Sequence, residues 1–128
     1  MIYLLDTHLL LWAAIKPERL SGKAVARIQD ETSGLMFSAA AIWEVAIKSN
    51  RNRADFTTDA RLLRRALLEN GYTELAISAE HAAATVGLPA LHKDPFDRIQ
   101  VAQARVEGLV LLTADPTVAE YGSPVELV

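Results

Sequence analysis

Residues 94–115 read DPFDRIQVAQARVEGLVLLTAD, and this stretch decides the fold. The opening Asp-Pro is typical of a helix start, because Asp caps the first turn and Pro suits the first helical position. The pattern predicts a helix over Pro95–Glu107 that ends at Gly108, a residue type common just past helix ends. The apolar run Leu109–Leu112 then predicts a buried strand. A helix followed at once by a short, wholly apolar strand is typical of a parallel sheet covered on both faces.

The same alternation of strand and helix patterns runs through the rest of the chain. Short apolar runs predict further strands over Ile2–Leu5, Leu35–Ser38, Thr73–Ile77 and Val125–Val128. The segments between them predict helices over His8–Ala14, Ser21–Asp30, Ala39–Ser49, Thr58–Glu69 and Ser78–Val86, and a helical turn over Thr117–Tyr121. We therefore expect one α/β domain over residues 1–128 with a parallel, doubly covered sheet.

Length and composition exclude several classes of protein. The chain has 128 residues, 51% hydrophobic and 23% charged, which excludes an intrinsically disordered chain. A net charge of −3 excludes a protein that is basic overall, although a local basic patch remains possible. Cysteine is absent, which excludes disulfides, zinc–thiolate sites, iron–sulfur clusters and a cysteine nucleophile. No stretch predicts a signal peptide or a membrane span, so we expect a cytoplasmic protein with no membrane partner.

Four acidic residues occupy positions that predict a functional site. Asp6 follows the first predicted strand and Asp115 follows the strand over Leu109–Leu112. Asp97 lies in the first turn of the helix before that strand, and Glu44 lies on the helix after the second strand. Ligands of open parallel sheets bind beyond the carboxyl ends of the strands, which right-handed connections bring to one edge. We expect at least three of these acids to meet there.

Each acid also has a simpler explanation when it is taken alone. Asp6 and Asp94 could be N-caps, Asp115 could belong to a turn with the proline after it, and Glu44 could pair with Lys48 at i,i+4. Together, however, carboxylates at one edge repel, and they raise each other's pKa or recruit a cation. For Glu44 the two explanations predict opposite results. Neutralising a mere partner of Lys48 should slightly lower stability, whereas relieving repulsion in the site should raise the stability of the metal-free protein.

The composition of the chain favours a magnesium-type cation. Mg²⁺ and Mn²⁺ prefer carboxylate and water oxygens, and no pair of the three histidines has the spacing of zinc ligands. Sequence signatures of nucleotide-binding loops and of serine hydrolases are absent. Trp12 and Trp43 stand among aliphatic residues, which predicts core positions, and His92 lies near the inferred site. Basic residues that could bind a phosphate backbone are Lys48, Arg51, Arg53, Lys93 and Arg98.

Four segments carry a resemblance to a known family. They are LLDTHLLLW at 4–12, SAAAIWEVAIK at 38–48, HKDPFDR at 92–98 and LVLLTAD at 109–115. In this order they resemble the PIN-domain ribonucleases, and most closely the VapC toxins of toxin–antitoxin modules. The resemblance implies a five-stranded parallel sheet with helices on both faces, and an endoribonuclease that uses Mg²⁺, with Mn²⁺ as a substitute, and a metal-activated water.

The resemblance also implies roles for individual residues and for partners. The acids that hold the metal and act in catalysis map onto Asp6, Glu44, Asp97 and Asp115. Residues in supporting positions map onto Thr113, Asp94 and Arg98. The expected partners are the RNA substrate, a small cognate antitoxin that blocks the acids, and a second copy of the chain in a homodimer.

Two alternatives remain open at this point. One is a non-catalytic PIN-like module that binds RNA or protein, against which the four intact acids count. The other is a small Mg²⁺-dependent phosphotransfer or receiver domain. Such a domain should have an acidic pair after the first strand and a lone Lys after the last, whereas here Thr7 and His8 follow Asp6 and no Lys follows the last strand.

Overall fold

A computed structural model describes residues 1–50 and 58–128, apart from the side chain of Asn50. Its five strands pair in parallel in the order β3-β2-β1-β4-β5, which confirms the predicted α/β class. They are β1 (Ile2–Leu5), β2 (Gly34–Ser38), β3 (Thr73–Leu75), β4 (Val110–Thr113) and β5 (Val125–Leu127). The chain winds from β1 outward to β3, and then returns to place β4 on the other side of β1. The crevice between β1 and β4 is therefore the point where ligands of such sheets bind.

Helices and helical turns connect the strands. The α-helices in the described residues are α1 (Thr7–Ile15), α2 (Gly22–Gln29), α3 (Ala39–Asn50), α4 (Ala60–Glu69), α5 (Ala79–Ala84), α6 (Pro95–Glu107) and α7 (Pro116–Ala119). Short 3₁₀ helices follow α1 at Pro17–Arg19 and α5 at Thr85–Gly87. Gly108 ends α6 in the left-handed conformation, at φ 68°, as its position predicts. Within the part of the chain that the structure describes, no helix has the length and apolar character needed to cross a membrane.

Several predicted elements are shorter in the structure, and β3 and α5 each have a local reason. The strand expected over Thr73–Ile77 ends at Leu75, because its last register partner is Ser38 and β2 gives way there to α3. The helix expected over Ser78–Val86 changes to a 3₁₀ turn after Ala84. At this point the Thr85 hydroxyl donates to the Ala82 carbonyl at 2.7 Å, which favours the tighter turn.

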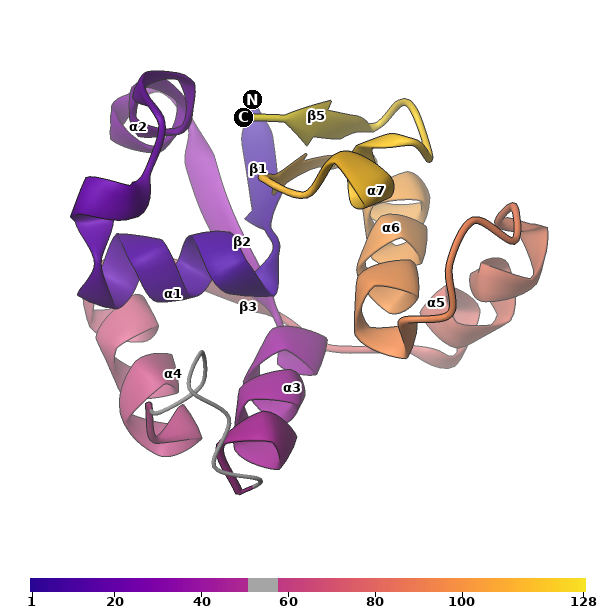
Figure 1. Cartoon of the computed structure of the whole chain (residues 1–128), viewed down its shortest axis with the longest axis horizontal. Helices are drawn as coiled ribbons and strands as arrows, with labels where there is room; N and C mark the ends of the chain where they lie inside the picture. Colours follow the sequence, from indigo (N-terminus) through magenta and orange to yellow (C-terminus); the bar gives the residue numbers. More distant parts are fainter. Residues whose placement is uncertain (51–57) are drawn as a thin grey trace.

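Alternate residues of β1 face opposite sides of the sheet, and each side has its own core. Tyr3 and Leu5 belong to a cluster with residues of α1, α3 and α4, whereas Leu4 belongs to a cluster with residues of α6 and α7. Figure 1 shows α1, α2 and α4 to the left of the sheet and α5 and α6 to the right. Because β1 is buried on both faces, the end of this strand is fixed firmly, and Asp6 is the next residue.

Candidate active site

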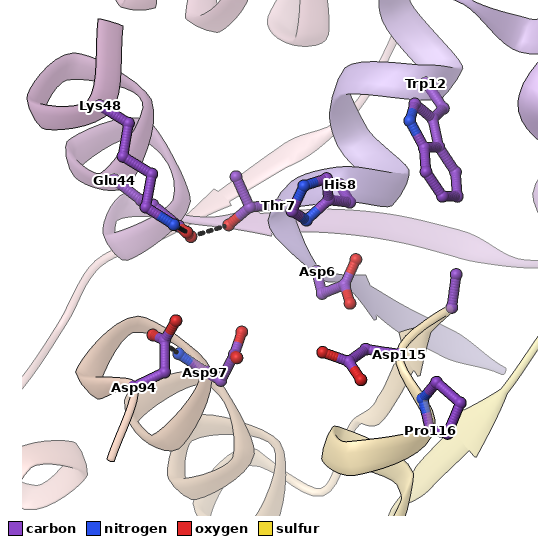
Figure 2. Close-up of a pocket in the computed structure, with 11 residues that line it drawn as sticks. Asp6, Thr7, His8, Trp12, Glu44, Lys48, Asp94, Asp97, Asp115 and Pro116 are labelled. Atoms are coloured by element: carbon purple, nitrogen blue, oxygen red, sulfur yellow. Dashed lines mark hydrogen bonds and ion pairs between the residues drawn. The ribbon is translucent and has the colours of Figure 1, made fainter. Parts of the chain in front are cut away.

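The acids gather in a pocket of about 380 Å³ at the carboxyl ends of β1 and β4. Five carboxylates and one ammonium group line it, those of Asp6, Glu44, Asp94, Asp97, Asp115 and Lys48. Figure 2 shows side chains from the end of β1 and from α1, α3, the start of α6 and the segment after β4 around one space. The four acids expected at one edge of the sheet therefore share one pocket with Asp94, which the sequence assigned to a cap.

Asp6 is both a helix cap and a pocket residue. Its Oδ1 accepts from the backbone N–H of Leu9 at 3.0 Å, which caps α1, and its Oδ2 accepts from the Thr113 hydroxyl. The residue is only 6% exposed. Burial raises the pKa of Asp6 to about 6, although these two hydrogen bonds act in the opposite direction. The pocket thus holds this carboxylate in position at an electrostatic cost.

Asp97 lies opposite, in the first turn of α6. Its Oδ2 lies 3.2 Å from Nε2 of His92. Burial raises the pKa of Asp97 to about 7, the negative charge of Asp94 adds to this effect, and the hydrogen bond with His92 opposes it. Burial and neighbouring negative charges thus raise the pKa values of both carboxyl groups, Asp6 and Asp97.

Asp94 acts as the N-cap of α6. Its Oδ1 accepts from the backbone N–H groups of Phe96 at 2.9 Å and Asp97 at 3.1 Å. We predict that Asp94→Ala lowers the free energy of unfolding by about 0.5–2 kcal/mol, the usual effect of a lost cap, and keeps most of the RNA cleavage that the sequence leads us to expect. Thermal unfolding and cleavage of total RNA measure the two quantities. Loss of cleavage at an unchanged melting temperature would instead place Asp94 among the metal ligands.

Glu44 satisfies both explanations that the sequence offered for it. It is 3% exposed, its Oε1 accepts from the Thr7 hydroxyl at 2.6 Å, and its Oε2 pairs with the Lys48 ammonium. Gln100 Nε2 lies 3.4 Å from the same Thr7 hydroxyl. Glu44 thus has an i,i+4 partner and still lines the acidic pocket. Its charge, unlike that of Asp6 or Asp97, has a cation directly beside it.

Asp115 lines the pocket at the end of β4, and Thr113 is buried behind it. Asp115 is exposed, and its Oδ1 accepts from the backbone N–H of Thr117 at 2.9 Å, which caps α7. The backbone N–H of Asp115 donates to the Thr113 hydroxyl at 3.0 Å, and this hydroxyl donates in turn to Asp6. Thr113 therefore ties the two strand ends on either side of the crevice together.

The basic residues predicted to bind RNA are not all at the pocket. Lys48 lines it, whereas Lys93 is exposed and lines a neighbouring hollow between α3 and α6. The Arg98 guanidinium donates to the Pro89 carbonyl at 2.8 Å and to the Tyr121 hydroxyl at 3.0 Å. Arg51 and Arg53 lie outside the described residues.

The two tryptophans have different environments. Trp12 is half-buried against the core and also lines the acidic pocket. The core position predicted for Trp43 is wrong, because this side chain is 60% exposed and meets Phe96 edge-on, with ring centroids 5.4 Å apart. Its position on α3 faces away from the sheet, so the aliphatic neighbours in sequence were misleading.

Several residues near the acids escaped the sequence interpretation. Thr7 was assigned only to a helix start, Gln100 was not singled out, and Tyr121 was only the end of a predicted turn. The available signal was a pair of glutamines, Gln100 and Gln103, on the face of α6 that also carries Val101 and Ala104 and is buried in the structure. The contacts of Thr7 and Tyr121 depend on residues more than 20 positions away, so local patterns could not reveal them.

The donor set fits a hard divalent cation. Over residues 1–50 and 58–128, no three His, Cys, Asp or Glu side chains form a ready-made metal cage. Mg²⁺ does not need one, because it keeps several waters and is commonly held by one or two carboxylates. Asp6 and Asp97 supply such carboxylates, and their raised pKa values indicate that a positive charge would stabilise their ionised forms.

Comparison with known proteins identifies the family. The model of the PIN domain matches residues 3–123. One similar solved structure is VapBC2 of Rickettsia felis bound to a promoter DNA fragment, with 15% sequence identity, a TM-score of 0.70 and an alignment that covers 100% of this chain and 98% of that chain. A toxin–antitoxin complex from Klebsiella pneumoniae has 20% identity, a TM-score of 0.67 and coverage of 97% of this chain and 95% of that chain. Mycobacterium tuberculosis VapC20, a sarcin–ricin loop cleaving toxin, has 15% identity, a TM-score of 0.67 and coverage of 94% of this chain and 95% of that chain. No curated protein sequence matches the chain significantly. The match of the family model over nearly the whole chain and the shared fold show that the chain belongs to the PIN domain family.

Proposed function

We propose that this chain is a divalent-metal-dependent endoribonuclease and the toxin of a VapBC-type toxin–antitoxin pair. The observation that carries the proposal is the pocket at the β1–β4 crevice, where burial and neighbouring carboxylates raise the pKa values of Asp6 and Asp97. Membership of the PIN family and a fold shared with VapC toxins support the same function.

In this proposal Mg²⁺, or Mn²⁺ in its place, is held by Asp6 and Asp97, with Glu44 and Asp115 binding directly or through water. When bound, such a cation lowers the pKa of a water ligand and stabilises negative charge on a phosphodiester. Thr113 orients Asp6 through its hydroxyl, and Thr7 and Lys48 orient Glu44. In this proposal Glu44 or Asp115 would accept the proton of the water that attacks the phosphodiester.

The proposed function also implies binding partners. Lys48 at the pocket and Lys93 on the neighbouring surface would contact the RNA phosphates, with Arg51 and Arg53 as further candidates. Two of the similar structures are described as VapBC2 and as a toxin–antitoxin complex. We infer a small cognate antitoxin that covers the acids of this chain, a homodimer, and action in the cytoplasm.

Metal binding tests the proposal without any assumption about the RNA. Titrating Mn²⁺ or Mg²⁺ into the chelator-treated protein should raise its melting temperature, because a ligand that binds only the native state stabilises it by about 2.7 kcal/mol at a hundred times its Kd. The response should disappear in Asp6→Asn, which keeps a capping side chain, and persist in the distant variant Asp59→Asn.

Activity is tested by sequencing RNA 5′ ends after induced expression. New 5′ ends that require Asp6 are expected. A chain that binds RNA but neither responds to metal nor creates new 5′ ends would instead be a non-catalytic binding module.

A further inference from the structure

A chain of hydrogen bonds leads from the surface of the molecule to Asp97. Arg98 Nη1 lies 3.0 Å from the Tyr121 hydroxyl, this hydroxyl lies 2.8 Å from His92 Nδ1, and His92 Nε2 lies 3.2 Å from Asp97 Oδ2. The four side chains come from α6, from the loop before it and from the segment after α7. They therefore connect the C-terminal part of the fold to the acidic pocket.

In the state with an ionised Asp97 and a neutral His92, the chemistry of the groups fixes the direction of every bond. A guanidinium can only donate, so the Tyr121 oxygen accepts from Arg98. The hydroxyl hydrogen of Tyr121 then points to His92 Nδ1, which accepts it. In a neutral imidazole with Nδ1 as acceptor, the hydrogen is on Nε2, and this N–H donates to Asp97. Arg98 and Tyr121 thus support the same tautomer of His92 that the Asp97 carboxylate requires.

Other contacts hold Arg98 and Tyr121 of this hydrogen-bond chain in place. Arg98 also donates to the backbone carbonyls of Pro89, at 2.8 Å, and Thr85, at 3.3 Å, so its guanidinium cannot swing toward the pocket without losing these bonds. Tyr121 is 6% exposed and packs in the core cluster that includes Leu4 and Val101. Its ring lies 5.4 Å from that of His92, centroid to centroid. Because Tyr121 is packed in this way, its hydroxyl can fix the orientation of the His92 ring.

We propose that Arg98, Tyr121 and His92 are positioning residues that hold the Asp97 carboxylate in the orientation that binds the divalent cation. The proposal rests on the metal-dependent function proposed above, and gives Arg98 a role other than binding RNA. Partners of this outer kind commonly change metal affinity by about 10–100-fold when they are removed. The N-cap of α6 already fixes the backbone of its first turn. The remaining freedom is the rotation of the Asp97 carboxyl group, which the hydrogen bond with His92 restricts.

The test is the affinity of the full-length protein for Mn²⁺, measured by calorimetry. His92→Ala should weaken binding by about 10–100-fold, and Tyr121→Phe, which keeps the aromatic ring in the core, should weaken it in the same direction by a smaller factor. His92→Gln places an amide N–H near the position of Nε2 and should restore much of the affinity. The matched control is Tyr72→Phe, which removes a hydroxyl from the other core cluster and should leave the affinity unchanged.

A purely structural role would not produce this pattern. Positioning predicts that cleavage by the His92 and Tyr121 variants recovers when Mn²⁺ is raised, whereas a folding defect would not respond. Wild-type affinity in folded His92→Ala and Tyr121→Phe, together with lost affinity in Asp97→Asn, would overturn the positioning role and leave the proposed function intact. Absence of Mn²⁺ binding in the wild-type protein would overturn both.

Discussion

Asp97→Asn will remove RNA cleavage and, in the metal-free protein, raise the melting temperature. The loss of activity should exceed the roughly 10–100-fold that removal of an outer partner of a metal site costs, because a charged ligand itself is lost. The gain in stability follows from the raised pKa of about 7, since the ionised form of Asp97 is the less favourable one in the folded pocket. Asparagine keeps the size of the side chain and removes the charge.

The pH dependence of stability gives a second prediction for the same variant. A carboxyl group whose pKa is higher in the native state binds a proton that the unfolded chain has already lost. The free energy of unfolding of the metal-free protein should therefore fall as pH rises from about 4, with Asp6 contributing up to about 6 and Asp97 up to about 7. In Asp97→Asn the decrease should become shallower, above all between pH 6 and 7.

Asp30→Asn is the matched control for this experiment. Hydrogen bonds from the hydroxyl and the backbone N–H of Thr32 lower the pKa of Asp30, so its ionised form stabilises the native state. Its neutralisation should not raise the melting temperature, and RNA cleavage should remain. A metal-free Asp97→Asn protein that melts below the wild type, with an unchanged pH profile, would contradict the account of the pocket as a site of unbalanced charge.

The sequence predicted the elements that local patterns control. The limits of α6 were correct at both ends because Asp94, Pro95 and Gly108 are strong local signals, and β1 was correct because Asp6 ends its apolar run. The end of β3 was missed because it depends on where β2 ends, which is a property of the pairing and not of residues 73–77. The exposure of Trp43 likewise depends on which face of α3 meets the sheet.

Asp6, Asp97 and Asp115 could be placed together from sequence because each stands at a strand end or a helix start on one side of a parallel sheet, whereas Glu44 stands in the middle of α3. What could not be predicted was how their charges are balanced. Lys48 was recognisable as an i,i+4 partner of Glu44, yet the sequence treated that pairing and the pocket as alternatives. The structure shows both together, and it shows that burial and neighbouring carboxylates raise the pKa values of Asp6 and Asp97.

This difference changes the result expected for Glu44→Gln. Relief of repulsion alone would raise the stability of the metal-free protein, as for Asp97→Asn. Glu44, however, is buried beside the Lys48 ammonium, whose side chain is only 19% exposed. Glutamine would leave that cation without its carboxylate, and removing one partner of a buried polar pair typically costs about 1–3 kcal/mol. We therefore expect Glu44→Gln to melt below the wild type in chelator and to lose RNA cleavage.

A double variant separates the two effects on Glu44. In Glu44→Gln with Lys48→Gln both charges are absent, so the melting temperature should recover most of the loss seen in Glu44→Gln alone, since replacing both members of a buried pair is often nearly neutral. Cleavage should not recover, because the site still lacks the Glu44 carboxylate. The melting temperatures of the two variants in chelator thus report the effect of the ion pair on stability. Their cleavage of total RNA with Mg²⁺ reports the role of Glu44 in the reaction. An active double variant would show that Glu44 serves only Lys48, and the active site would then consist of the three aspartates.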